Sequence, residues 1–171
     1  MHRLLESEGL GSVTFGRLSR ETGVSRTTLY RHWSGPSELI SEAWARVAPS
    51  NRAAHTTDLQ ADLVELFLSV RDVVESSTMR RSLPTLLVAA QRDRVIAGLH
   101  ADFVRDRRQP IVERLRLAAA EGQIADVDPE LLVDLLSGPL FYRQLIRRTR
   151  TSDDDVRTFV ATVLASVTRR P

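Results

Sequence analysis

The hydrophobic residues of this chain recur with helical spacing over most of its length. From residue 152 onward, apolar side chains return at intervals of three and four positions, which is the period of an amphipathic helix. They are Val156, Phe159, Val160, Val163, Leu164 and Val167. No segment alternates apolar and polar residues with the period of two that indicates a β-strand. The pattern therefore predicts an all-α protein.

Caps, prolines and glycines divide the pattern into successive helices. We predict helices over residues 1–8, 14–21, 26–32, 36–48, 57–75, 79–92, 93–120, 129–148 and 152–167. Thr57 and Gln60 predict a capping box. Asp128 and Pro129 predict an N-cap followed by a first-turn proline, and Ser152 predicts the last N-cap.

Residues 14–33 form the most distinctive pair of helices. Thr14 and Ser25 are predicted caps, and Gly23 supplies the positive φ that the end of the first helix requires. Apolar residues between the two helices are expected to hold their angle, namely Leu18, Val24, Leu29 and Trp33. Two helices of about two turns joined by such a turn are typical of a helix-turn-helix, whose second helix lies in the DNA major groove.

The outward face of this pair is basic. Residues 17–32 contain four arginines and a histidine against one acid, Glu21, whereas the whole chain carries a net charge of only +2. A local basic face favours contact with DNA phosphates. Capped helices joined by a glycine also occur in helical proteins that bind no DNA, so that alternative remains open at the level of spacing.

Three segments follow one another in a recognisable order. They are Thr22-Gly23-Val24-Ser25, then Leu29-Tyr30-Arg31-His32-Trp33, then Gly35-Pro36-Ser37-Glu38-Leu39. With the capping residue Thr14, this run resembles the DNA-binding domain of the TetR family of transcriptional regulators. That family usually has Ala-Gly-Val-Ser in the turn, Leu-Tyr near the end of the recognition helix, then His-Phe and Ser-Lys-Glu-x-Leu.

The resemblance and the position of the second helix together assign contact roles. We hypothesise that Arg26, Thr27 and Thr28 face base edges. The resemblance implies that Thr14, Ser25, Tyr30 and His32 contact phosphates.

Three features depart from the family pattern. Pro36 replaces a lysine that often touches a phosphate, so that contact is expected to be absent. Thr27 stands where the family often has glycine, so base preference does not transfer. Only eight residues precede Gly9, which makes the first predicted helix shorter than usual.

The polar stretch before residue 57 has no periodicity and is read as a joint between domains. We predict a helix-turn-helix DNA-binding domain over residues 1–48 and a helical regulatory and dimerisation domain over residues 49–171. The resemblance implies that the last two helices pair with a second subunit, and a two-fold protein matches palindromic DNA sites. The predicted interface residues, which would alternatively serve an ordinary intrachain core, are Leu132, Leu135, Leu136, Val156, Phe159, Val160, Val163 and Leu164.

The resemblance also implies a small-molecule cavity in the second domain. Residues that fit such a lining, and that equally fit a plain core, are Phe67, Met79, Gln91, His100, Phe103 and Phe141. The sequence does not identify the effector.

Composition restricts the chemistry. The chain has no cysteine, and all 24 of its basic residues are arginine, which excludes zinc-thiolate sites and Schiff-base catalysis. No histidine follows a glutamate by three residues, as a di-metal bundle requires, and no phosphate loop or hydrolase motif occurs. We therefore expect no enzyme activity, no metal and no cofactor. No apolar run reaches the length that spans a bilayer, and a cytoplasmic location is expected.

Together these observations predict a ligand-responsive transcriptional regulator. It is expected to be a repressor that binds a palindromic operator as a homodimer and is released by a small molecule. The alternatives are a helical regulator that acts through a protein partner with weak DNA binding and, less favoured, a helical-bundle enzyme.

Overall fold

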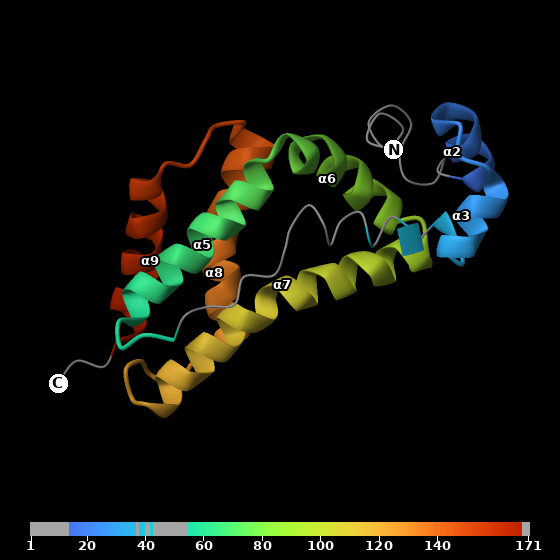
Figure 1. Cartoon of the computed structure of the whole chain (residues 1–171). Coiled ribbons are helices and arrows are strands. Elements are labelled where there is room, and N and C mark those ends of the chain that lie inside the picture. Colours follow the sequence, from blue (N-terminus) through green and yellow to red (C-terminus); the bar gives the residue numbers. More distant parts are fainter. Residues whose placement is uncertain (1–13, 37, 40–41, 43–54, 169–171) are drawn as a thin grey trace. The chain divides into compact units, whose positions relative to one another are not determined.

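The computed structural model describes residues 14–36, 38–39, 42 and 55–168, and the regular elements of this part are all helices (Figure 1). In chain order they are α2 (Phe15–Thr22), α3 (Arg26–His32), α5 (Leu59–Glu75), α6 (Ser77–Ala90), α7 (Arg94–Ala120), α8 (Pro129–Phe141), the π-helix η2 (Tyr142–Arg147) and α9 (Asp153–Val167). The predicted all-α class is confirmed. Within the described residues, no helix has the length and apolar character needed to cross a membrane.

The chain divides into two compact units. One contains α2, α3, α6 and α7 up to Val104, and the other contains α5, α7 from Arg105, α8, η2 and α9. The predicted helix over residues 1–8 and most of the one over residues 36–48 lie outside the described residues. The predicted domain boundary after residue 48 lies outside them as well.

Most helices begin at the predicted caps. The side chain of Asp128 accepts a bond from the backbone N–H of Glu130, and Ser152 forms a reciprocal capping box with Asp155. At α5 the predicted capping box is wrong by one residue, because Asp58 caps this helix and accepts from the N–H of Ala61 at 2.9 Å. A carboxylate ranks above a threonine hydroxyl at this position.

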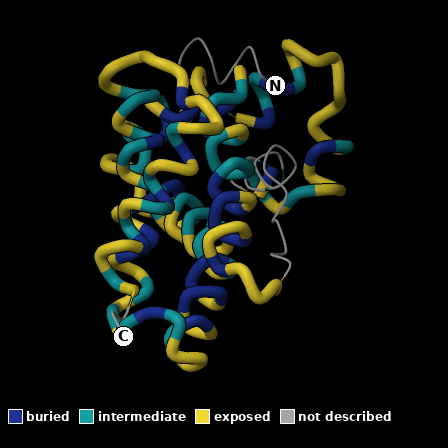
Figure 2. Tube along the Cα trace, turned by 90° about the vertical axis from the view of Figure 1, so that its left-hand side faces the viewer, coloured by how far each residue is buried: buried dark blue, intermediate teal, exposed yellow. Residues whose placement is uncertain are grey.

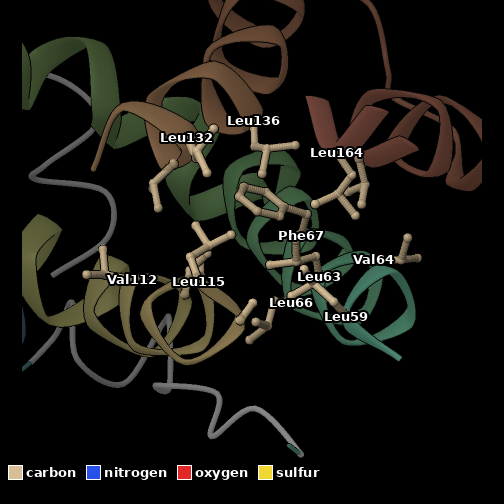
Figure 3. Packing of buried hydrophobic residues seen from close by; sticks show 14 of the residues in the cluster. Leu59, Leu63, Val64, Leu66, Phe67, Val112, Leu115, Leu132, Leu136 and Leu164 are labelled. Atoms are coloured by element: carbon tan, nitrogen blue, oxygen red, sulfur yellow. The ribbon is translucent and has the colours of Figure 1, made fainter. Parts of the chain in front are cut away.

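The second unit is built around a core in which α5, α8 and α9 pack against one another, with α7 alongside. Phe67 of α5 is 1% exposed and lies among leucines of α5 and α8 (Figure 3). Leu115 and Val112 extend this core from α7. In Figure 2, buried and exposed residues alternate along the coils of the helices, as expected for amphipathic helices with one buried face.

One ion pair is buried beside this core. The Nε of Arg114 lies 2.6 Å from Oδ2 of Asp62, and the two side chains are 1% and 3% exposed. Thr56 donates its N–H and its hydroxyl to the Asp62 carboxylate, while its carbonyl accepts from Nη2 of Arg114. Burial disfavours the Asp62 anion, but these hydrogen bonds and the guanidinium charge outweigh it, so the pKa of Asp62 lies below its usual value.

The segment over residues 129–148 differs from the single predicted α-helix. The α-helix ends at Phe141, the winding widens into η2, and Arg148 ends the segment with a φ of 53°. Pro139 has no N–H to donate, so one α-helical bond is lost just before the winding changes.

Candidate nucleic-acid interface

The helix pair α2–α3 forms as the sequence predicts (Figure 1). The hydroxyl of Thr14 accepts a bond from the N–H of Arg17 at 3.2 Å, and Ser25 accepts one from Thr28 at 3.1 Å. Gly23 has a φ of 73° and donates its N–H to the carbonyl of Ser19. Both predicted caps and the glycine turn between them are confirmed.

Apolar contacts hold the two helices together from the inner side. The two helices are in contact, and their apolar residues are buried: Phe15 and Leu18 of α2 are each 2% exposed and Leu29 of α3 is 6% exposed. The rings of Tyr30 and Phe15 meet edge to face, with 4.8 Å between ring centroids and an interplanar angle of 80°. Val24, which was expected to help hold the angle between the helices, lies in the surface turn and is 38% exposed.

The outward residues of the pair are accessible with one exception. Thr14, Ser25, Arg26, Thr27, Tyr30 and His32 are exposed. Thr28 is half-buried, and its hydroxyl oxygen lies 2.9 Å from that of Ser25, so the cap engages both hydroxyls. Their contacts with DNA remain a prediction.

Arg26 does not extend straight from the start of α3. Its guanidinium lies against Gly16 in the first turn of α2, where an added methyl group would come within 3.0 Å of Nη2 and 3.3 Å of Cζ. Sequence reasoning missed this contact, because ten positions separate the two residues.

The chain after α3 is fixed by polar contacts. Trp33 is half-buried, and its indole N–H donates to Glu42 at 2.7 Å. Ser34 donates both its N–H and its hydroxyl to Glu38, and these bonds hold the pKa of the Glu38 carboxyl below its usual value. Pro36 occupies a helical position, as expected for a first-turn proline. These hydrogen bonds connect the residues just after α3 to Glu38 and Glu42.

The predicted dimer residues divide by burial. Five of them are buried in the chain's own core, so their part in a dimer contact stays a prediction: Leu132, Leu136, Val156, Val160 and Leu164. Phe159 and Val163 are partly buried, and Leu135 is 50% exposed. Both roles demand apolar side chains, so their pattern alone did not separate an intrachain core from an interface.

The six predicted ligand residues fall in both compact units. Phe67 is core and Phe141 half-buried in one unit. In the other, Met79 is buried, His100 and Phe103 are half-buried, and Gln91 is exposed. Burial lowers the pKa of His100.

The second unit also has a polar pocket of about 610 Å³. Its lining includes none of the six predicted ligand residues and consists of Arg71, Asp72, Glu75, Ser76, Arg150, Thr151, Ser152 and Asp155. The predicted ligand lining remains a prediction.

Known proteins resemble both parts of the chain. Residues 2–43 match the family model described as bacterial regulatory proteins of the tetR family, and residues 53–163 match the tetracyclin repressor-like C-terminal domain. The uncharacterised HTH-type transcriptional regulator Mb1581 of Mycobacterium bovis is 30% identical over 177 residues, which cover 98% of this chain and 84% of that protein. YdeS of Bacillus subtilis, also named as an uncharacterised HTH-type transcriptional regulator, is 25% identical over 168 residues, with coverage of 96% and 84%.

A solved structure agrees with these relatives. The crystal structure of the TetR family transcription regulator SCO0332 is 33% identical and superposes with a TM-score of 0.70, covering 98% of this chain and 94% of that one. The capped helix pair, the helical second unit and both family matches point the same way. The chain belongs to the TetR family of helix-turn-helix transcriptional regulators, which are DNA-binding proteins rather than enzymes.

Proposed function

We propose that this protein is a ligand-responsive repressor that acts in the cytoplasm, binds a palindromic operator as a homodimer and leaves it when a small molecule binds the C-terminal part. The observation that carries the DNA-binding half of the proposal is the exposed outer face of α3. Arg26, Thr27 and Tyr30 are all accessible there, while Leu29 anchors the helix from the opposite side.

The chemistry of this face suits DNA. Arg26 offers a planar fork of donors, and a bidentate arginine–guanine pair contributes roughly 1–3 kcal/mol of discrimination between bases. The Thr14 oxygen accepts a backbone bond within its cap, which leaves the hydroxyl proton free to donate to a phosphate oxygen. Tyr30 is 63% exposed, and its edge-to-face contact with Phe15 restricts the ring, so less freedom is lost when its hydroxyl donates to a phosphate.

The homodimer is supported by a stripe of exposed apolar residues on α8 and η2. Leu131 and Leu135 are each 50% exposed, Tyr142 is 56% exposed and Ile146 is 68% exposed. Gly138 lies between them in the sequence, and a side chain built there would meet nothing within 4 Å, so a partner helix has room to approach. We assign the dimer contact to this stripe, with Phe159 and Val163 of α9 beside it.

A small-molecule effector is supported by proteins that share the fold. The flavonoid-responsive regulator FrrA superposes with a TM-score of 0.77 at 14% identity, and SmeT, solved as a triclosan complex, does so with 0.65 at 18% identity. At such identities only the fold is shared, so the chemical class of this protein's effector does not follow from theirs.

The DNA-binding part is tested with duplexes selected from a random library by the full-length protein. We expect an inverted repeat, and affinity should fall with salt by a slope of about −0.9 per phosphate neutralised. Arg26→Ala should bring the affinities for the selected and a scrambled duplex closer together, whereas Tyr30→Phe should weaken both alike. A salt-independent, unselective interaction would instead favour a regulator that acts through a protein partner, an alternative motivated by Pro36 in place of the family's lysine.

A further inference from the structure

Gly16 differs from the other glycines of the described chain in what surrounds it. A side chain added at Gly23, Gly35, Gly98, Gly122 or Gly138 would meet nothing within 4 Å. At Gly16 an added methyl group would meet the Arg26 guanidinium, at 3.0 Å from Nη2, 3.3 Å from Cζ and 3.5 Å from Nε. Three atoms of one guanidinium therefore lie over the bare backbone of this residue.

The backbone does not explain the glycine. Gly16 belongs to the first turn of α2, and the positive φ values among the described glycines are those of Gly23 and Gly122. An ordinary helical conformation does not require glycine, and glycine is less favourable there than alanine. The chain thus carries a helix-weakening residue at a position where the absent side chain makes room for an arginine.

We propose that Gly16 is a positioning residue for DNA recognition, because its bare backbone is the surface against which the Arg26 guanidinium packs. This inference rests on the proposed role of Arg26 in reading DNA. Arg26 is exposed, and a free arginine side chain samples many rotamers, most of which must be given up on binding. Contact with α2 restricts the guanidinium before DNA arrives, so less freedom is lost in the complex.

The geometry also says what a side chain at position 16 would displace. The nearest atoms belong to the end of a long, flexible side chain, so the guanidinium yields and the two helices keep their contact through Phe15, Leu18 and Leu29. Gly16→Ala should therefore change where Arg26 sits without unfolding the pair. It should also strengthen α2 itself, because alanine is the better helix former.

The test compares the wild type, Gly16→Ala, Arg26→Ala and the double variant on a duplex selected by the full-length protein and on a scrambled duplex. The matched control is Gly98→Ala, a glycine of helix α7 whose surroundings are open. We expect both glycine variants to raise the Tm slightly, by about 1–4 °C. Of the two glycine variants, only Gly16→Ala should lose affinity for the selected duplex relative to the scrambled one, by roughly 3-fold or more. The loss should not exceed that of Arg26→Ala, which is about 5- to 150-fold for one bidentate contact.

The double variant decides whether the effect passes through Arg26. Once Arg26 is alanine, changing Gly16 should cost no further selective affinity. The inference is overturned if Gly16→Ala binds like the wild type while Arg26→Ala does not, if the two losses add, or if Gly16→Ala lowers the Tm. If Arg26→Ala itself binds like the wild type, the proposed reading role of Arg26 fails instead, and the inference fails with it.

Discussion

The buried pair of Asp62 and Arg114 allows a sharp stability prediction. In Asp62→Asn the carboxylate charge is lost, and an NH₂ group takes the place of one acceptor oxygen. One oxygen accepts from the hydroxyl of Thr56, and the other accepts from Nε of Arg114 and the N–H of Thr56. The amide can turn its NH₂ toward the Thr56 hydroxyl, which then accepts and can donate to the carbonyl of Asp58. The loss is therefore mainly one of charge, because Arg114 remains charged at 1% exposure.

The expected size of this effect follows from burial. Removing one partner of a buried ion pair typically costs about 3–5 kcal/mol of the free energy of unfolding, because the other charge is left uncompensated. For a chain of this size, that corresponds to a fall in Tm of roughly 6–20 °C. Replacing both partners with apolar residues, as in Asp62→Leu with Arg114→Met, removes the stranded charge. The double variant should therefore have a larger free energy of unfolding than Asp62→Leu alone or Arg114→Met alone.

Thermal and urea denaturation of the full chain measure these differences. Asp72→Asn is the matched control, because Asp72 pairs with Arg71 at the surface with 70% of its side chain exposed. A surface pair of this kind contributes only about 0–1 kcal/mol. A change in Tm for Asp62→Asn as small as that for Asp72→Asn would refute the reasoning, and so would a double variant less stable than both single ones.

Three further outcomes follow from the structure. The pKa of Asp62 in the folded chain lies below its usual 3.8, so the ionised carboxylate stabilises the fold above pH 3.8, and this contribution is lost as the pH falls through the folded-state pKa. Between about pH 6 and 2, the Tm of the wild type should therefore drop more steeply than that of Asp62→Asn. Equal slopes for the two proteins would contradict this. Gly23→Ala forces alanine to a φ of 73° and should cost about 1–2 kcal/mol in urea unfolding, whereas Gly35→Ala, where no positive φ is needed, should not. If the protein sediments as the proposed dimer, Leu135→Arg should shift it toward the monomer, while Leu117→Arg, on α7, should leave its sedimentation unchanged. A dimer unaffected by Leu135→Arg would place the contact elsewhere.

Local signals explain why so much of the helical layout is predictable. A cap and the N–H that it binds lie two or three residues apart, as with Ser25 and Thr28 or Asp128 and Glu130, so one short window of sequence contains both partners. The Gly23 turn is encoded in the same way, because only the local φ decides which residue fits. Even the error at α5 is local, since two adjacent residues compete for one capping position and Asp58 takes it.

The features that the sequence did not reveal depend on distant residues. Asp62 and Arg114 are 52 positions apart, and each alone looks like an ordinary charged residue on a helix. The apolar residues of α8 and α9 satisfy the helical period equally well whether they face their own chain or a partner. The structure adds which of them the chain's own core covers: Leu136 is 2% exposed, whereas Leu135, its neighbour in the sequence, is 50% exposed.

The proposed DNA-reading face depends on both local and distant residues. Pattern and charge are enough to place Arg26, Thr27 and Thr28 at the start of α3, because cap, turn and helix follow one another within a few residues. How accessible these three side chains are to DNA depends on contacts that the sequence pattern does not reveal. The hydroxyl of Thr28 is engaged with Ser25, and the guanidinium of Arg26 lies on Gly16 of the preceding helix. Thr27 is exposed, so base choice by this helix should depend on Thr27 together with an arginine whose direction is set from α2.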